Sequence, residues 1–297
     1  MIVPWRDRRG QFLPLKAAVF AAAFPPAIWY SYWWIVGDAG PRPVTEAIYG
    51  AGLWTIRFFL ISLAITPVAR MLQWPGLLLV RRTVGLTGLA YGLAHLFFYT
   101  MDQKFVLGTV VSEILTRFYL TIGFLALLGF STLGVTSTNG MIKRMGRWWK
   151  RVHYLTYLLI AMGVFHYFIQ SKANVSEPVF VAGLYAWLML WRALPRGWQT
   201  GWAAYPALAA VAGLATAGIE FAWYGLATRI SPWRVLAANE SIDFGLRPAH
   251  WVFVAGVVVV ALVIGRRITG SRSSGPTPSR TAYASSGMPP SRPAQSA

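Results

Sequence analysis

Residues 147–172 read RWWKRVHYLTYLLIAMGVFHYFIQSK, and the prediction of the fold depends on this stretch. Its apolar run is long enough for one helix across a membrane, which needs about 20 residues. It carries two of the chain's four histidines, His153 and His166. An imidazole inside hydrocarbon is costly and usually faces a partner, a cavity or a cofactor. One histidine near each end suggests a metal centre at each membrane face, with haem as the leading candidate.

The composition is that of a polytopic membrane protein. Of the 297 residues, 56% are apolar and only 12% are charged, and the mean hydropathy is +0.49. The net charge of +18 comes from short basic blocks between apolar runs, a pattern typical of membrane topology rather than of nucleic-acid binding. The absence of cysteine excludes disulfides, iron–sulfur clusters and cysteine-ligated zinc.

Apolar runs predict an all-α bundle of about eight transmembrane helices. We expect the spans near 15–36, 49–68, 84–101, 118–136, 152–170, 178–194, 203–227 and 249–265. The first span should be kinked at Pro25 and Pro26. The tail, 269–297, is rich in Ser, Pro and Gly and is predicted to be disordered. No nucleotide-binding motif appears, so the chain is not expected to take electrons from NAD(P)H unaided.

Basic residues predict the orientation. The N-terminus, the loops 68–83, 137–151 and 192–202 and the tail hold 19 of the 27 Lys and Arg residues, whereas the opposite loops hold seven. Both termini are therefore expected to be cytoplasmic.

Two of the histidines are expected to lie at the same depth in the membrane. His95, in the span near 84–101, and His166 should both lie toward the outer face, as two axial ligands of one haem must. His153 should lie at the cytoplasmic end, about 20 Å from His166 along an ideal helix and about 140° around its axis. The helix is therefore distorted, or the two histidines serve different sites. The alternative is that the histidines only form hydrogen bonds within the bundle, which is the favoured reading for His250 at the outer interface.

Several motifs resemble those of a known family. They are RRTVGLTGLAYGLAHLFFY at 81–99, LTRFYLTIGFLALLGFSTLGVTS at 115–137, and W-x-x-x-H followed by a second histidine 13 residues later, from Trp149 to His166. Over roughly residues 1–200 the chain is similar to the MsrQ (YedZ) family, haem-binding membrane subunits of a protein-methionine-sulfoxide reductase system, and to the wider ferric reductase-like transmembrane domains. The resemblance implies a six-helix ferric reductase-like domain at 1–200. The two further helices expected from the apolar runs, at 201–268, lie beyond the resemblance.

The resemblance also implies a function. It suggests an inner-membrane carrier of one or two b-type haems, with His95, His153 and His166 as candidate iron ligands. Electrons would come from the quinone pool or a cytoplasmic flavin reductase. They would pass to MsrP, a periplasmic molybdopterin enzyme that reduces methionine sulfoxide in oxidised proteins, so the chain would be an electron-transfer subunit rather than the catalytic one. FMN is implied by the resemblance alone. The chain lacks a second histidine near 81–82 that oxidase-type relatives carry.

Three arginines are further candidates for cofactor binding. Arg81 and Arg82 should lie at the inner mouth, where they suit haem propionates, a quinone or a flavin through charge-assisted hydrogen bonds; as plain topology residues they need no ligand. Arg57 lies inside a predicted span and needs an anionic or carbonyl partner such as a propionate, unless its side chain reaches the interface.

The sequence is also compatible with two other functions. The first is a haem-containing metal-ion reductase, or a cytochrome b subunit for another periplasmic enzyme. The second is a transporter whose histidines titrate, which predicts no haem. Absence of repeat symmetry and of intramembrane acidic pairs disfavours the transporter.

Overall fold

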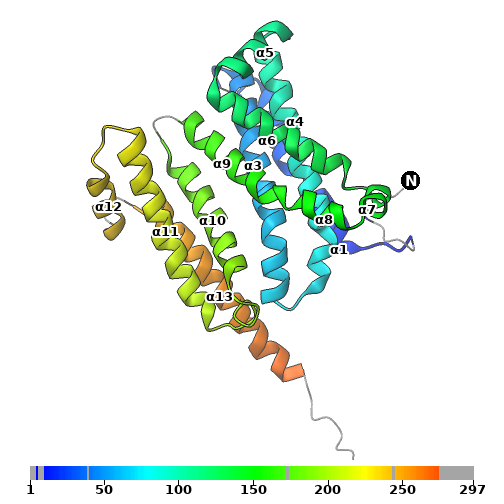
Figure 1. Ribbon diagram of the computed structural model, residues 1–297, viewed down its shortest axis with the longest axis vertical. Coiled ribbons are helices and arrows are strands. Elements are labelled where there is room, and N and C mark those ends of the chain that lie inside the picture. Colours follow the sequence, from blue (N-terminus) through cyan, green and yellow to red (C-terminus); the bar gives the residue numbers. More distant parts are fainter. Residues whose placement is uncertain (1–4, 6–9, 39, 172–173, 243–244, 274–297) are drawn as a thin grey trace, which may run out of the picture.

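The computed structural model describes residues 5, 10–38, 40–171, 174–242 and 245–273, and its elements are helices, as predicted (Figure 1). Six helical segments in this part of the chain are long and apolar enough to cross a membrane. They are Pro43–Met71 (α3), Pro75–Asp102 (η1, Pro75–Val80, and α4, Arg81–Asp102), Phe118–Val135 (α6), Arg147–Ser171 (α8, Arg147–His153, and α9, Leu155–Ser171), Ala204–Ala227 (α11), and Pro248–Ile268 within α13 (Pro248–Ser273). The chain is a multi-pass membrane protein.

Two of the eight predicted spans do not meet this criterion. The segment expected near 15–36 forms two helices, α1 (Pro14–Ala21) and α2 (Pro25–Val36). Pro25 and Pro26 lack the N–H groups that a continuous helix needs, so a new helix begins there. The segment expected near 178–194 is a helix, α10 (Ser176–Ala193), but Glu177 and Arg192 at its two ends reduce its apolar length.

Helix α3 lies at the centre of the fold (Figure 1). It packs along α4 and also contacts α9 and α10. Buried apolar side chains of α3, α6, α9 and α10 form the main core, in which the rings of Phe59 and Phe130 stack with centroids 3.7 Å apart. Such contacts are the source of helix association in lipid, where no hydrophobic driving force acts between helices.

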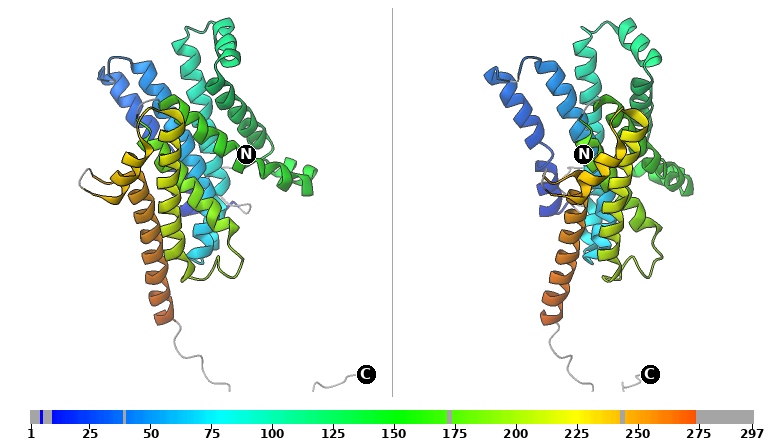
Figure 2. Two further views of the ribbon diagram at one scale, coloured as in Figure 1. Left: turned by 60° about the vertical axis from the view of Figure 1, so that its left-hand side comes forward. Right: turned by 90° about the vertical axis from the view of Figure 1, so that its left-hand side faces the viewer.

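Small residues bring the C-terminal helices together. α11 packs against both α10 and α13, beside the rest of the bundle (Figure 2). A Cβ atom at Gly183 would lie 2.3 Å from Thr216 Oγ1, and one at Gly256 would lie 2.5 Å from the Cβ of Ala209. These glycines allow the close approach of backbones that is typical of helix pairs in membranes.

Three local features differ from the predicted layout. The helix expected over 152–170 is interrupted at Tyr154, where α8 ends and α9 begins, so His153 and His166 lie on separate helices. The loop between α4 and α6 contains a short helix, α5 (Leu107–Thr116), and α7 (Asn139–Met145) and α12 (Pro232–Glu240) occupy two other connections. α13 continues to Ser273, so 269–273, the start of the predicted tail, are helical; 274–297 lie outside the described residues.

Candidate functional site

His95 of α4 and His166 of α9 lie side by side in the bundle. Their ring centroids are 6.3 Å apart, and their ring planes are nearly perpendicular, at 83°. This placement agrees with the equal depth predicted from the sequence. The two residues are 71 positions apart in the chain, so the packing of α4 and α9 around α3 and α6 creates the pair.

Each of these two imidazoles is held by a backbone carbonyl. His95 Nδ1 lies 2.8 Å from the Ile48 carbonyl oxygen of α3, and His166 Nδ1 lies 2.7 Å from the Tyr119 carbonyl oxygen of α6. A carbonyl only accepts, so each Nδ1 must carry the proton and donate it. The tautomer is thereby fixed with a lone pair on Nε2, and neither Nε2 has a hydrogen-bond partner among the described residues.

Glycines make room for both rings. A Cβ atom at Gly52 of α3 would lie 2.9 Å from His95 Nδ1, and one at Gly123 of α6 would lie 2.7 Å from His166 Nδ1. Contacts this short would force the imidazoles away from their carbonyl acceptors. Gly88 and Gly92 of α4, by contrast, lie against Phe59 and against Leu127 and Thr55, which is close helix packing.

The pair fits a haem iron. A metal–imidazole bond is about 2 Å long and the ring centre lies about 1 Å beyond the nitrogen, so two imidazoles on opposite sides of one metal have centres about 6 Å apart. The observed 6.3 Å agrees with this spacing. Within the described residues, no group of three or more His, Asp or Glu side chains is arranged to hold a metal ion. A porphyrin iron, however, takes only axial ligands from the protein, and two imidazoles could serve as these.

His153 has a different environment. Its Nδ1 lies 3.0 Å from the Trp149 carbonyl oxygen, its Nε2 lies 3.3 Å from Ser137 Oγ, and the Trp149 indole stacks on its ring at 3.9 Å. Trp149 is fixed in turn because its Nε1 donates to the Thr136 carbonyl. The Trp149 carbonyl only accepts, so Nδ1 of His153 carries the proton. The Ser137 hydroxyl donates to the Leu133 carbonyl at 2.7 Å and lies beside the Nε2 lone pair of His153.

The arginines lie near different groups. Arg81 begins α4, on the His153 side of the bundle, where its charge acts on His153 and on Arg192. Arg82 donates to Asn139 Oδ1 at 2.9 Å. The structure therefore brings Arg81, but not the His95–His166 pair, close to His153.

Arg57 has a protein partner that the sequence reasoning did not consider. Its guanidinium forms an ion pair with Glu177 of α10 at 2.5 Å and lies over the Trp54 ring. The side chains of Arg57 and Glu177 are 38% and 47% exposed. The anionic partner that the sequence required is a carboxylate of the same chain.

Two further polar clusters were not predicted. Glu220 of α11 is only 1% exposed and binds Arg247 at 2.6 Å and Asn239 at 2.8 Å, which ties α12 and the start of α13 to α11. His250 accepts from the Arg247 N–H through Nδ1, a structural role that agrees with the interpretation of His250 as a non-ligand.

A second cluster ties α5 to the end of the bundle where the paired histidines lie. Glu113 accepts from Tyr99 at 2.6 Å and from Arg117 at 2.8 Å, and Thr121 donates to the Ile114 carbonyl. A hydrogen bond to Tyr119 and the charge of Glu113 raise the pKa of Arg117, which therefore stays charged. Arg117 directly precedes α6 and the Tyr119 carbonyl that holds His166.

Comparison with known proteins agrees with this geometry. The family model "Ferric reductase like transmembrane component" matches residues 51–164, which contain His95 and His153 and end two residues before His166. Over these residues the chain is similar to ferric reductase-like transmembrane components, a class of helical membrane proteins.

The curated relatives narrow the class further. A "protein-methionine-sulfoxide reductase heme-binding subunit MsrQ" from Caulobacter vibrioides is 40% identical over 197 residues, covering 65% of this chain and 94% of the relative. Proteins of the same name from Rhodospirillum rubrum and Brucella anthropi are 38% and 36% identical, over 64% and 59% of this chain and 90% and 79% of theirs. The chain belongs to the MsrQ family. No solved structure matches it significantly.

Proposed function

We propose that this protein is the haem b-binding membrane subunit of a protein-methionine-sulfoxide reductase system, with His95 and His166 as axial ligands of one haem. The observation that carries the proposal is the 6.3 Å separation of two imidazoles whose Nδ1 atoms are both held by carbonyls. The names of the relatives support it, because they describe heme-binding subunits of such a system.

A haem at this site would supply a one-electron redox centre whose potential depends on its ligands and its burial. The protein's own residues hold and orient the two histidines. The Ile48 and Tyr119 carbonyls keep Nε2 of each histidine deprotonated and increase its basicity, and Gly52 and Gly123 leave room for the rings. The chain therefore needs no side chain that donates or accepts protons at the metal.

The electron path that we propose starts at the quinone pool or at a cytoplasmic flavin reductase and ends at a periplasmic molybdopterin-dependent reductase, MsrP. The chain would be the electron-transfer subunit, and the partner would carry out the reduction that repairs oxidised proteins. FMN is not part of the proposal, because neither the described residues nor the names of the relatives support it.

Arg81, Arg82 and His153 are proposed to form the site at the electron-entry end. A second haem or a quinone would meet a positive charge from Arg81 there, and His153 would supply one ligand through Nε2, beside the Ser137 hydroxyl. Arg57 is the weaker candidate for a propionate contact, since Glu177 already supplies its counter-charge.

We further propose eight membrane crossings with both termini on the cytoplasmic side of the bacterial inner membrane. The contacts of α10 with both α9 and α11 support a crossing there despite its end charges, and the α1–α2 pair would make another. The 197 matched residues leave 100 of the 297 unmatched. This length favours a core over 1–200 and two added helices that begin after 200 and end with α13 at Ser273.

Reconstitution tests the proposal. The purified chain in lipid nanodiscs is reduced anaerobically with a soluble ubiquinol, and the periplasmic reductase and methionine sulfoxide are then added. The expected result is a b-type absorption spectrum that is reduced by the quinol and reoxidised only when both additions are present. A protein without such a spectrum, or one whose reduced haem is unaffected by the reductase and its substrate, would contradict the proposal.

A metal-ion reductase is the second candidate, favoured by the description of the matching family model. The same reduced sample distinguishes the two functions when ferric citrate replaces the reductase and its substrate. Reoxidation by ferric citrate at a rate equal to or above that with the periplasmic enzyme would favour the metal reductase.

A further inference from the structure

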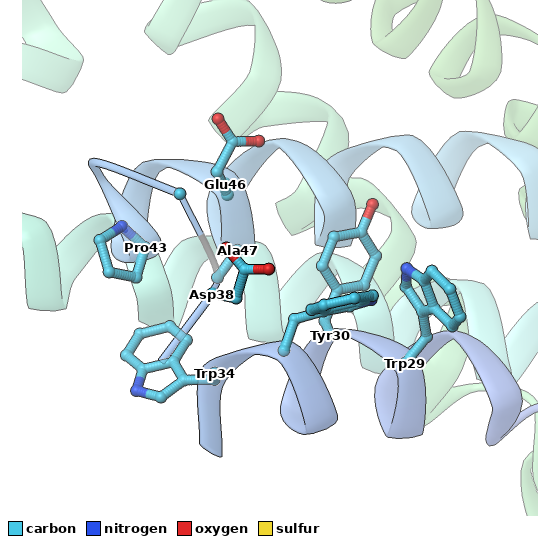
Figure 3. Close-up of a pocket in the computed structure, with 9 residues that line it drawn as sticks. Trp29, Tyr30, Trp34, Asp38, Pro43, Glu46 and Ala47 are labelled. Carbon is cyan, nitrogen blue, oxygen red and sulfur yellow. The ribbon is translucent and has the colours of Figure 1, made fainter. Parts of the chain in front are cut away.

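A cavity of about 340 Å³ lies between α2 and α3 at the same end of the bundle as the paired histidines (Figure 3). Glu46 and Ala47 of α3 line it, and the next residue, Ile48, holds His95 through its carbonyl. The volume is within the range of small-molecule sites, which begins at about 300 Å³.

Aromatic rings form one wall of this cavity. Trp29, Trp33, Trp34 and Tyr30 of α2 all line it, and Figure 3 shows Trp29, Tyr30 and Trp34 projecting from α2 while Glu46 and Ala47 come from α3. The Trp29 and Trp33 rings pack edge to face with centroids 5.6 Å apart. Tyr30 is fixed against Gly50 of α3, where a Cβ atom would lie 2.3 Å from its ring.

The charged residues that line the cavity, Asp38 and Glu46, are both acidic. Neither carboxylate has a hydrogen-bond or ion-pair partner among the described residues. The nearby cation Arg57 is already bound to Glu177 and lies over Trp54. The cavity therefore combines electron-rich ring faces with two uncompensated negative charges.

We propose that this cavity binds a quaternary ammonium group of the kind that choline carries. A cation is attracted both to indole faces and to carboxylates. A small metal ion would need several oxygen ligands to replace its water shell, and aromatic walls do not provide them. An alkylated ammonium is weakly hydrated and presents methyl groups to the rings, so it suits the whole lining. The source is either free choline or the headgroup of phosphatidylcholine, since tryptophans are enriched at headgroup depth.

Lipid retention tests this proposal without any requirement for haem. The full chain is reconstituted in nanodiscs with equal amounts of phosphatidylcholine and phosphatidylglycerol, and the retained lipids are counted by native mass spectrometry. The expected result is preferential retention of phosphatidylcholine, which tetramethylammonium chloride displaces and sodium chloride does not. The double variant Asp38→Asn, Glu46→Gln and the single variant Trp33→Leu should each lower the preference about 2- to 30-fold, the range of a cation–aromatic contact.

Matched variants control for folding and for general surface charge. Asp102→Asn removes an exposed carboxylate elsewhere, and Trp198→Leu removes an exposed indole elsewhere, so both should keep the wild-type preference. If calorimetry detects binding of tetramethylammonium but the retained lipids show no preference for phosphatidylcholine, the ligand of the cavity is a free quaternary ammonium. Absence of both effects, or equal effects in the double variant and the wild type, would overturn the proposal.

Discussion

At one end of the bundle, His95 and His166 each bind a carbonyl through Nδ1 and leave Nε2 without a described partner, whereas Nε2 of His153 has the Ser137 hydroxyl beside it at 3.3 Å. The paired histidines come from two helices and have glycines beside them. His153 is enclosed by its own chain segment, under Trp149 and against Ser137.

This difference separates a pre-arranged ligand pair from a histidine with a hydroxyl beside its Nε2. The paired site has a ring spacing and tautomers that suit metal binding. At His153 the Ser137 hydroxyl occupies the space 3.3 Å from Nε2, where a metal ion would bind. A titratable histidine in a membrane span is therefore not sufficient to identify a ligand, and the partners of both nitrogens have to be known.

Removal of either paired histidine should have the largest effect. In His95→Ala and in His166→Ala, one axial ligand is missing and we expect the loss of the haem from this site. The pyridine haemochrome assay, expressed as haem per polypeptide, measures it. His250→Ala is the control, because His250 only caps α13. Full haem content in both variants would show that the pair is not the ligand set.

Substitutions that crowd the imidazole rings of His95 and His166 should have the next largest effect on haem binding. Gly52→Ala and Gly123→Ala place a methyl group 2.9 and 2.7 Å from Nδ1 of His95 and His166 and disturb the hydrogen bonds to the carbonyls. Loss of such outer contacts typically costs about 10- to 100-fold in metal affinity, and haem titration of the apoprotein measures it.

The matched control for crowding is Gly218→Ala in α11, where nothing lies within 4 Å of the added Cβ. This variant should bind haem as the wild type does. Unchanged affinity in Gly52→Ala and Gly123→Ala would show that the carbonyl contacts do not support the ligands.

Variants at His153 should have a smaller and separate effect. We expect His153→Ala to keep the spectrum of the paired site and to slow reduction by quinol, because the residue lies with Arg81 at the proposed entry end. Ser137→Ala removes the hydroxyl beside Nε2 of His153 and should leave the paired site unchanged while it alters the quinol reaction. Loss of the paired-site spectrum in His153→Ala would mean that the two sites are not independent.

The ion pair of Arg57 should matter least. It is about half exposed, so Glu177→Gln should lower the free energy of unfolding by about 0–1 kcal/mol, and thermal unfolding followed by circular dichroism measures the change. Haem content should stay at the wild-type value in Arg57→Gln. A loss of haem in that variant would instead favour the propionate contact.

The sequence predicted the depth of the paired histidines, because helical rise converts residue position into height. It did not predict Ile48, Tyr119, Gly52 or Gly123 as their neighbours, because these contacts depend on how helices rotate against each other. α5 could have been found, since Val110, Ile114 and Leu107, Val111, Leu115 recur at helical spacing. The interruption of the helix at Tyr154 agrees with one of two alternatives from the sequence, a distorted helix between His153 and His166; the other was that the two histidines serve different sites. The buried Glu220 and the Arg57–Glu177 pair were missed because partners distant in sequence leave no local signal.

Electron paramagnetic resonance of the oxidised protein tests the central claim most directly. Ring planes at 83° in a six-coordinate ferric haem predict a highly anisotropic low-spin signal, present in the wild type and in His153→Ala and lost in His95→Ala and His166→Ala. A low-spin signal that survives removal of His95 or His166, or a wild-type protein with only high-spin iron, would contradict the assignment of His95 and His166 as a haem-ligand pair.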